Sequence, residues 1–203
     1  MDYAIVSGAD FLQFKPGVDI QKMHELFDWA NNGKRGLILF IDEADALLRD
    51  RKILNDQGVA LVNSFLARTN ASSDKFMLIL ATNYPNNLDS AVLSRISKKL
   101  EIPLPGQAER IRLFERYFKE HIENTQDNVK LIIDTPFTHE RIATIAQKIE
   151  GFSGREIEQL LAEIRIESII ANNNHVSYQL VDRITQDKAE QHRKEQEWLK
   201  QQN

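Results

Sequence analysis

The stretch Leu37-Ile38-Leu39-Phe40-Ile41-Asp42-Glu43 decides the fold of this chain, because an unbroken apolar run ends in two adjacent carboxylates. Short apolar runs without alternation are typical of strands in a parallel sheet that helices cover on both faces. A similar run, Phe76 to Ala81, follows one helical pattern later. We therefore predict an α/β fold with a parallel sheet. Asp42 and Glu43 then stand at the carboxyl end of a strand, where open α/β sheets bind ligands.

The rest of the chain first repeats this alternation of strand and helix and then becomes helical, with the change at Pro103-Leu104-Pro105-Gly106. Alternating elements favour a parallel sheet. We predict an α/β part over residues 1–104 and a small all-helical domain over residues 105–203. The predicted strands are 3–6, 37–41, 76–81 and 100–104, with a loop over 7–18. The predicted helices are 19–31, one through Val59 and Leu66, one through Ile111 and Ile122, and three near 138–149, 153–172 and 177–200, with a polar loop at about 123–136.

Composition and charge narrow the class of protein. The chain has 203 residues and a formal net charge of −4, whereas nucleic-acid binders usually carry a basic excess, so direct nucleic-acid binding is not expected. It has no Cys and therefore forms neither a disulfide nor a thiolate metal site. Its longest apolar run is too short to cross a bilayer, and its first residues lack the pattern of a targeting signal.

The two carboxylates at the strand end suit phosphoryl chemistry. One can hold Mg²⁺ through water, since magnesium keeps several waters and takes few protein ligands. The other can orient and deprotonate an attacking water. We assign Asp42 to magnesium and Glu43 to the water. The alternative is a strand that simply ends in two acidic, solvent-facing residues.

Asn83 follows the next predicted strand, within Leu80-Ala81-Thr82-Asn83. Its neutral amide can hydrogen-bond the same attacking water without changing the charge of the site. The alternative is turn chemistry, because Asn is common in loops of this composition. The position of Asn83, one helix and one strand after Glu43, favours the functional interpretation.

The residues Asp42-Glu43-Ala44-Asp45 also spell the helicase motif D-E-A-D. Helicases with this motif carry a Ser-Ala-Thr motif downstream and a second parallel α/β domain. Here the downstream strand leads into Ala81-Thr82-Asn83, and the part that follows is helical. The sequence therefore disfavours the helicase interpretation.

A phosphate-binding glycine loop is missing from the sequence. No G-x-x-x-x-G-K-[ST] motif occurs, although such a loop is expected before a strand of this kind. We expect this chain alone neither to bind ATP tightly nor to hydrolyse it. Two interpretations stay open: an ATPase module whose phosphate loop is encoded outside these residues, and a non-catalytic scaffold or regulatory module.

Taken together, the motifs resemble those of the AAA+ ATPases along nearly the whole chain. The similarity lies in the acidic strand end, in the Ala-Thr-Asn stretch at 81–83, in Pro103-Leu104-Pro105 and in Gly151-Phe152-Ser153-Gly154. Ser153-Gly154-Arg155-Glu156-Ile157 and Trp198-Leu199-Lys200 are similar to one mitochondrial subfamily, the ATPase family AAA domain-containing protein three. The resemblance implies ATP and Mg²⁺ as cofactors. It also implies a homo-oligomeric ring, a hexamer, that remodels a protein or a membrane-associated complex. It also implies a place at the mitochondrial inner membrane in a eukaryote, and otherwise in the cytoplasm.

The resemblance also implies roles for three residues. Asn83 would be the sensor-one residue, and Arg95 would be the finger that reaches the γ-phosphate held by the neighbouring subunit. Arg155 would be the sensor-two arginine, in the first turn of a helix that the capping-box pattern Ser153 to Glu156 predicts. The alternative for both arginines is a solvent-exposed side chain. In the family order of strands, five-one-four-three-two, the strand at 76–81 would have an open edge here, which favours aggregation.

Overall fold

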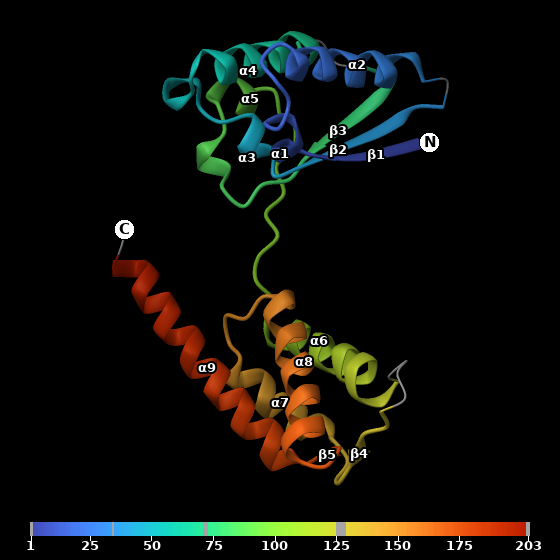
Figure 1. Cartoon of the computed structure of the whole chain (residues 1–203), viewed down its shortest axis with the longest axis vertical. Helices are drawn as coiled ribbons and strands as arrows, with labels where there is room; N and C mark the ends of the chain where they lie inside the picture. Colours follow the sequence, from blue (N-terminus) through green and yellow to red (C-terminus); the bar gives the residue numbers. More distant parts are fainter. Residues whose placement is uncertain (1, 34, 71–72, 125–128, 202–203) are drawn as a thin grey trace. The chain divides into compact units, whose positions relative to one another are not determined.

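The computed structural model describes residues 2–33, 35–70, 73–124 and 129–201. The chain divides into two compact units, residues 1–100 and residues 101–203. The first unit contains a sheet with helices, and the second is mainly helical (Figure 1). Among the described residues, no helix has the length and apolar character that a membrane crossing requires.

The first unit contains the predicted parallel sheet. Its strands are β1 (Asp2–Ser7), β2 (Leu37–Asp42) and β3 (Phe76–Leu80), in the spatial order β1-β2-β3. The two crossovers contain the helices α2 (Val18–Asn32) and α4 (Asp56–Arg68). A parallel pair needs such a crossover, because a short turn cannot return the chain to the same end of the sheet. The parallel α/β core is thus confirmed.

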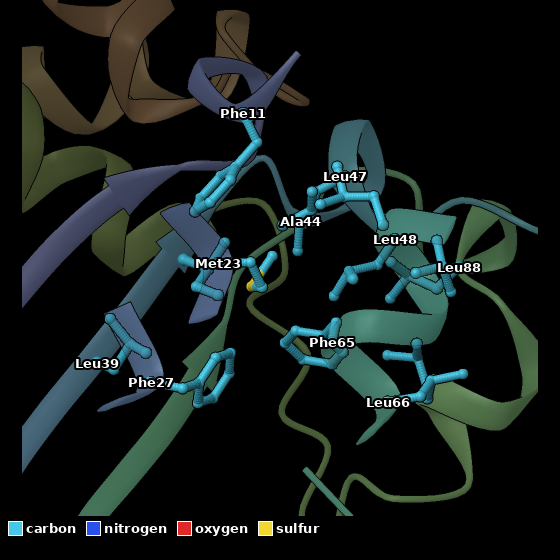
Figure 2. Packing of buried hydrophobic residues seen from close by; sticks show 14 of the residues in the cluster. Phe11, Met23, Phe27, Leu39, Ala44, Leu47, Leu48, Phe65, Leu66 and Leu88 are labelled. Carbon is cyan, nitrogen blue, oxygen red and sulfur yellow. The ribbon is translucent and has the colours of Figure 1, made fainter. Parts of the chain in front are cut away.

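Helices α2 and α4 cover one face of this sheet, which contains the hydrophobic core of the unit (Figure 1). Phe27 of α2 and Phe65 of α4 are nearly inaccessible, and their rings meet edge to face with centroids 5.8 Å apart. Figure 2 shows Phe27 beside Leu39 of β2, whose side chain is fully buried. Burial of each such large side chain contributes about 2–3 kcal/mol to the stability of the unit.

The other face of the sheet is apolar and open, which corrects the prediction that the strands are buried on both faces. The strand register aligns Tyr3, Ile38 and Met77 in one row and Ile5, Phe40 and Ile79 in the next. Met77 is 57% exposed and Tyr3 76% exposed. The sequence pattern records how apolar a strand is, but not which of its two faces is covered.

The prediction of a strand at 100–104 is wrong, because these residues are described and form no strand. Leu100, Ile102 and Leu104 alternate as expected, but they belong to no strand and are 76%, 93% and 60% exposed. A strand exists only where a neighbour accepts its backbone hydrogen bonds, and here no described strand pairs with this segment. The apolar alternation therefore occurs in a segment that pairs with no described strand.

The connections of the first unit contain short helical turns. The predicted loop at 7–18 includes helix α1 (Gly8–Phe11), whose N-cap is Ser7. The Ser7 hydroxyl accepts a hydrogen bond from the Ala9 N–H at 3.2 Å. Phe11 is then buried against the core, as Figure 2 shows. The remaining turns are α3 (Ala44–Leu47), η1 (Arg51–Ile53), η2 (Pro85–Asn87) and α5 (Ser90–Leu93).

The second unit is a helical bundle with a small sheet. Phe114, Ile145, Leu161 and Val181 are among its buried core residues. Its elements are α6 (Gln107–Phe118), η3 (Lys119–Glu123), β4 (Ile132–Ile133), α7 (His139–Lys148), α8 (Gly154–Ala171), β5 (His175–Val176) and α9 (Tyr178–Gln201). Strands β4 and β5 pair in parallel, so the expectation of an all-helical domain is wrong in this detail. Two-residue strands give no periodic signal, and β4 falls in the predicted polar loop, of which residues 125–128 lie outside the described residues.

Candidate functional site

Strand β2 carries the acidic pair to the carboxyl edge of the sheet. Asp42 is its last residue, and Glu43 follows with φ 49° and ψ 43°, in the left-handed region. A residue with a side chain is uncommon there. The Asp42 carboxylate accepts a hydrogen bond from the Glu43 N–H at 2.9 Å, and both side chains are exposed. The backbone therefore turns sharply at Glu43 and leaves both carboxylates accessible.

Two residues that sequence reasoning missed adjoin Glu43. The Ser7 hydroxyl donates to Glu43 Oε2 at 3.1 Å. A Cβ at Gly8 would lie 2.5 Å from the Glu43 carbonyl oxygen, so only glycine fits at this position. Ser7 is the last residue of β1 and pairs with Asp42 in the strand register. The end of the predicted first strand is therefore the sequence signal that could have located Ser7 and Gly8.

Asn83 lies just beyond strand β3 and is exposed. Strands β2 and β3 are parallel neighbours, so the structure brings the Asn83 turn to the same sheet edge as the acidic pair. The Ala44 N–H donates to the Ala81 carbonyl oxygen at 2.9 Å, which joins the segments that follow the two strands. A polar amide and two carboxylates thus share one edge of the sheet.

Arg95 lies after α5 and contacts the C-terminal end of α4. Its guanidinium donates to the Leu66 carbonyl oxygen, to Thr69 Oγ1 at 3.4 Å and to Asn70 Oδ1 at 3.3 Å. A cation is favourable there, because the last carbonyl groups of a helix lack partners and carry partial negative charge. The structure therefore places Arg95 on α4 within its own chain.

Arg155 is exposed in the first turn of α8, in the second unit. The predicted capping box is present, since the Glu156 N–H donates to the Ser153 hydroxyl at 3.3 Å and the Ser153 N–H donates to Glu156 Oε2 at 2.7 Å. Burial raises the pKa of Glu156, but the hydrogen bonds from Ser153 and His192 outweigh it and leave the pKa below its ordinary value. An ionised Glu156 thus fixes the turn that presents Arg155.

An ion pair between a partly exposed arginine and a buried carboxylate, which the sequence did not indicate, holds the chain after Asn83. Arg51 Nε lies 2.9 Å from Asp89 Oδ2, and the Asp89 side chain is only 3% exposed. Asp89 also caps α5 by accepting the Ala91 N–H. Burial raises the pKa of Asp89, and the hydrogen bonds from Arg51 and Ala91 lower it further than burial raises it.

The residues at the sheet edge fit magnesium held mainly by water and phosphate. Within the described ranges, no group of three or more His, Cys, Asp or Glu residues could hold a metal on its own. Mg²⁺ seldom uses such a cage and prefers one or two carboxylates with water and phosphate oxygens. Asp42 and Glu43 supply exposed carboxylates of that kind.

A parallel sheet with a carboxylate pair and an amide at its carboxyl edge, followed by a helical unit, defines the class of the AAA ATPase domains. Residues 1–104 match the family described as "ATPase family associated with various cellular activities (AAA)", and the chain belongs to this family. It is 40% identical over 98% of its length to the human ATPase family AAA domain-containing protein 3A and 36% identical to the Caenorhabditis elegans ATPase family AAA domain-containing protein 3. It covers 35% and 34% of those two proteins, about a third of their length.

A solved structure supports the same fold. The chain resembles the FIGL-1 AAA domain, solved in complex with ADP, with a TM-score of 0.68 and 21% identity. The match covers 91% of this chain and 61% of that domain. The similarity of fold is thus independent of close sequence similarity.

Proposed function

We propose that this chain is part of the ATP-hydrolysing module of an AAA ATPase, with residues 1–104 as the α/β part and residues 105–203 as a helical lid. The observation that carries the proposal is the shared sheet edge of Asp42, Glu43 and Asn83. These are the groups that water-mediated cleavage of a phosphoanhydride needs: a metal-binding carboxylate, a base and a neutral hydrogen-bonding amide.

Each of these side chains has a distinct role in the proposal. Asp42 holds Mg²⁺ through water, and Glu43 orients a water and accepts its proton. Asn83 hydrogen-bonds that water without adding charge. When bound, ATP would supply the phosphoanhydride bond, and Mg²⁺ would neutralise the negative charge that develops on its cleavage.

The proposal extends to a ring of identical subunits, a hexamer, that remodels a protein or a membrane-associated complex. Arg95 acts on the nucleotide of the neighbouring subunit, and Arg155 binds the nucleotide of its own subunit. Arg95 must leave its contacts on α4 to do so, and these contacts involve no carboxylate among the described residues. The proposal also includes the mitochondrial inner-membrane site that the sequence resemblance described above implies.

The test has two parts. Calorimetric titration of this chain with ATP and Mg²⁺ should show no micromolar binding, since its sequence contains no phosphate-binding glycine loop. In an assembled ring that contains such a loop, Glu43→Gln should preserve ATP binding and abolish turnover. Arg95→Ala should also spare binding and abolish turnover. Loss of binding in both variants would contradict these roles.

A second candidate is a non-catalytic AAA subunit that acts as a scaffold or regulatory module. A non-catalytic subunit would leave the turnover of its ring unchanged when Glu43 is replaced by Gln. The same variant therefore separates the two candidates.

A further inference from the structure

The fourth residue of the D-E-A-D stretch, Asp45, has a side-chain partner beyond the next strand. Thr82 Oγ1 lies 2.5 Å from Asp45 Oδ1, and the hydroxyl is the donor because a carboxylate only accepts. The same hydroxyl accepts the Tyr84 N–H at 2.9 Å. The two bonds form a directed chain, from the Tyr84 amide through Thr82 to Asp45, that spans Asn83.

The backbone supports the same connection. The Ala81 N–H donates to the Ile41 carbonyl oxygen and the Ala44 N–H donates to the Ala81 carbonyl oxygen, both at 2.9 Å. Pairing between the two chain segments thus continues past the ends of the strands. Glu43 lies between the anchors Ile41 and Ala44, and Asn83 follows the anchor Ala81 by two residues. The side chains of Glu43 and Asn83 are both exposed.

We propose that Asp45 and Thr82 are positioning residues that fix the separation between the Glu43 carboxylate and the Asn83 amide during ATP hydrolysis. The proposal rests on the proposed function. Among the described residues, theirs is the one side-chain hydrogen bond that joins the segment 42–45 to the segment 81–84. Without it, the Asn83 turn is tied to the acidic segment through backbone bonds alone. A shift of about 1 Å in a reacting group can lower a rate about 10²-fold.

The test compares variants that remove the bond with variants that keep it, in an assembled ring that hydrolyses ATP. Thr82→Val removes the hydroxyl and Asp45→Ala removes its acceptor, whereas Thr82→Ser and Asp45→Asn retain a donor and an acceptor. Thr144→Val is the matched control, because in the part of the chain that the structure describes the Thr144 hydroxyl bonds only within its own helix, to the Glu140 carbonyl oxygen. Amide exchange of Tyr84 in this chain reports the hydrogen bond that the Tyr84 N–H donates to the same Thr82 hydroxyl.

Thr82→Val and Asp45→Ala should lower kcat about tenfold to a hundredfold and change KM less than about twofold. Thr82→Ser, Asp45→Asn and Thr144→Val should stay within about threefold of the unaltered ring, and Thr82→Val should speed exchange of the Tyr84 amide. Unchanged kcat in Thr82→Val and Asp45→Ala, or equal losses in the conservative variants, would overturn the positioning role alone. An unaltered ring without turnover would overturn the proposed function and this role with it.

Discussion

His192 Nδ1 lies 2.7 Å from Glu156 Oε1, so the C-terminal helix α9 is bound to the first turn of α8. The other oxygen of Glu156 accepts the Ser153 N–H. The His192 ring also packs on Phe152, with ring centroids 4.8 Å apart. One carboxylate therefore closes the cap of α8 and anchors α9, beside the proposed nucleotide-binding Arg155.

Glu156→Ala should lower the free energy of unfolding of the chain by about 1–2 kcal/mol, because it removes a cap and a charged hydrogen bond. Gln159→Ala, an exposed neighbour on the same helix, is the control and should change stability by less than about 0.5 kcal/mol. Urea unfolding followed by circular dichroism measures both. Equal effects of the two variants would show that the cap contributes nothing specific.

The lowered pKa of Glu156 also sets a pH dependence. A carboxyl group whose folded pKa lies below its unfolded value stabilises the fold above the unfolded pKa, and this contribution is lost as pH falls through the folded pKa. The ordinary value is 4.5. Below about pH 4.5 the unaltered chain should therefore lose stability more steeply than Glu156→Ala, and the difference between them should narrow. Urea unfolding repeated at several pH values between neutral and acid checks this.

The sequence predicts where helices and strands lie in this fold better than it predicts which elements pair or pack together. The strand through Leu39 and the cap at Ser153 follow from local signals, an apolar run and a spaced Ser and Glu. The prediction of a strand through Ile102 is wrong because a strand forms only beside a neighbouring strand, and the local sequence does not encode that neighbour. Likewise Ser7 reaches Glu43 only through the strand register, across a separation of 36 residues.

Gly8→Ala should destabilise the chain by about 1–3 kcal/mol and displace the turn at Glu43, because the new methyl group would lie 2.5 Å from a backbone carbonyl oxygen. The control is Gly33→Ala, whose Cβ would meet its nearest neighbour, the Ala30 carbonyl oxygen, at an ordinary 3.7 Å. Gly33 has φ −65°, which alanine adopts freely. Thermal unfolding compares the two, and a Gly8→Ala chain as stable as Gly33→Ala would refute the close approach.

Arg51→Ala should lower the free energy of unfolding by about 1–3 kcal/mol, because it leaves the buried Asp89 carboxylate without its charged partner. Lys52→Ala removes an exposed neighbouring cation with no side-chain hydrogen bond among the described residues, and it should be nearly neutral. The unfolding free energies of both variants at neutral pH decide the matter. A loss in Lys52→Ala as large as that in Arg51→Ala would indicate a general effect of charge rather than the ion pair.

The open apolar face of the sheet should drive self-association of this chain. Met77 and Ile79 lie on this face, on β3, which is the last strand in the order of the described sheet. A strand edge without a paired neighbour, next to an exposed apolar face, favours association with another chain. Met77→Lys should oppose this, since a charged side chain on an exposed face must be desolvated before two copies can pack. Ile170→Lys introduces the same charge at a residue that is 79% exposed on α8, and serves as the control. Sedimentation velocity over a range of concentrations should show less association for Met77→Lys alone, and equal reduction by both variants would assign the effect to net charge instead of to the sheet.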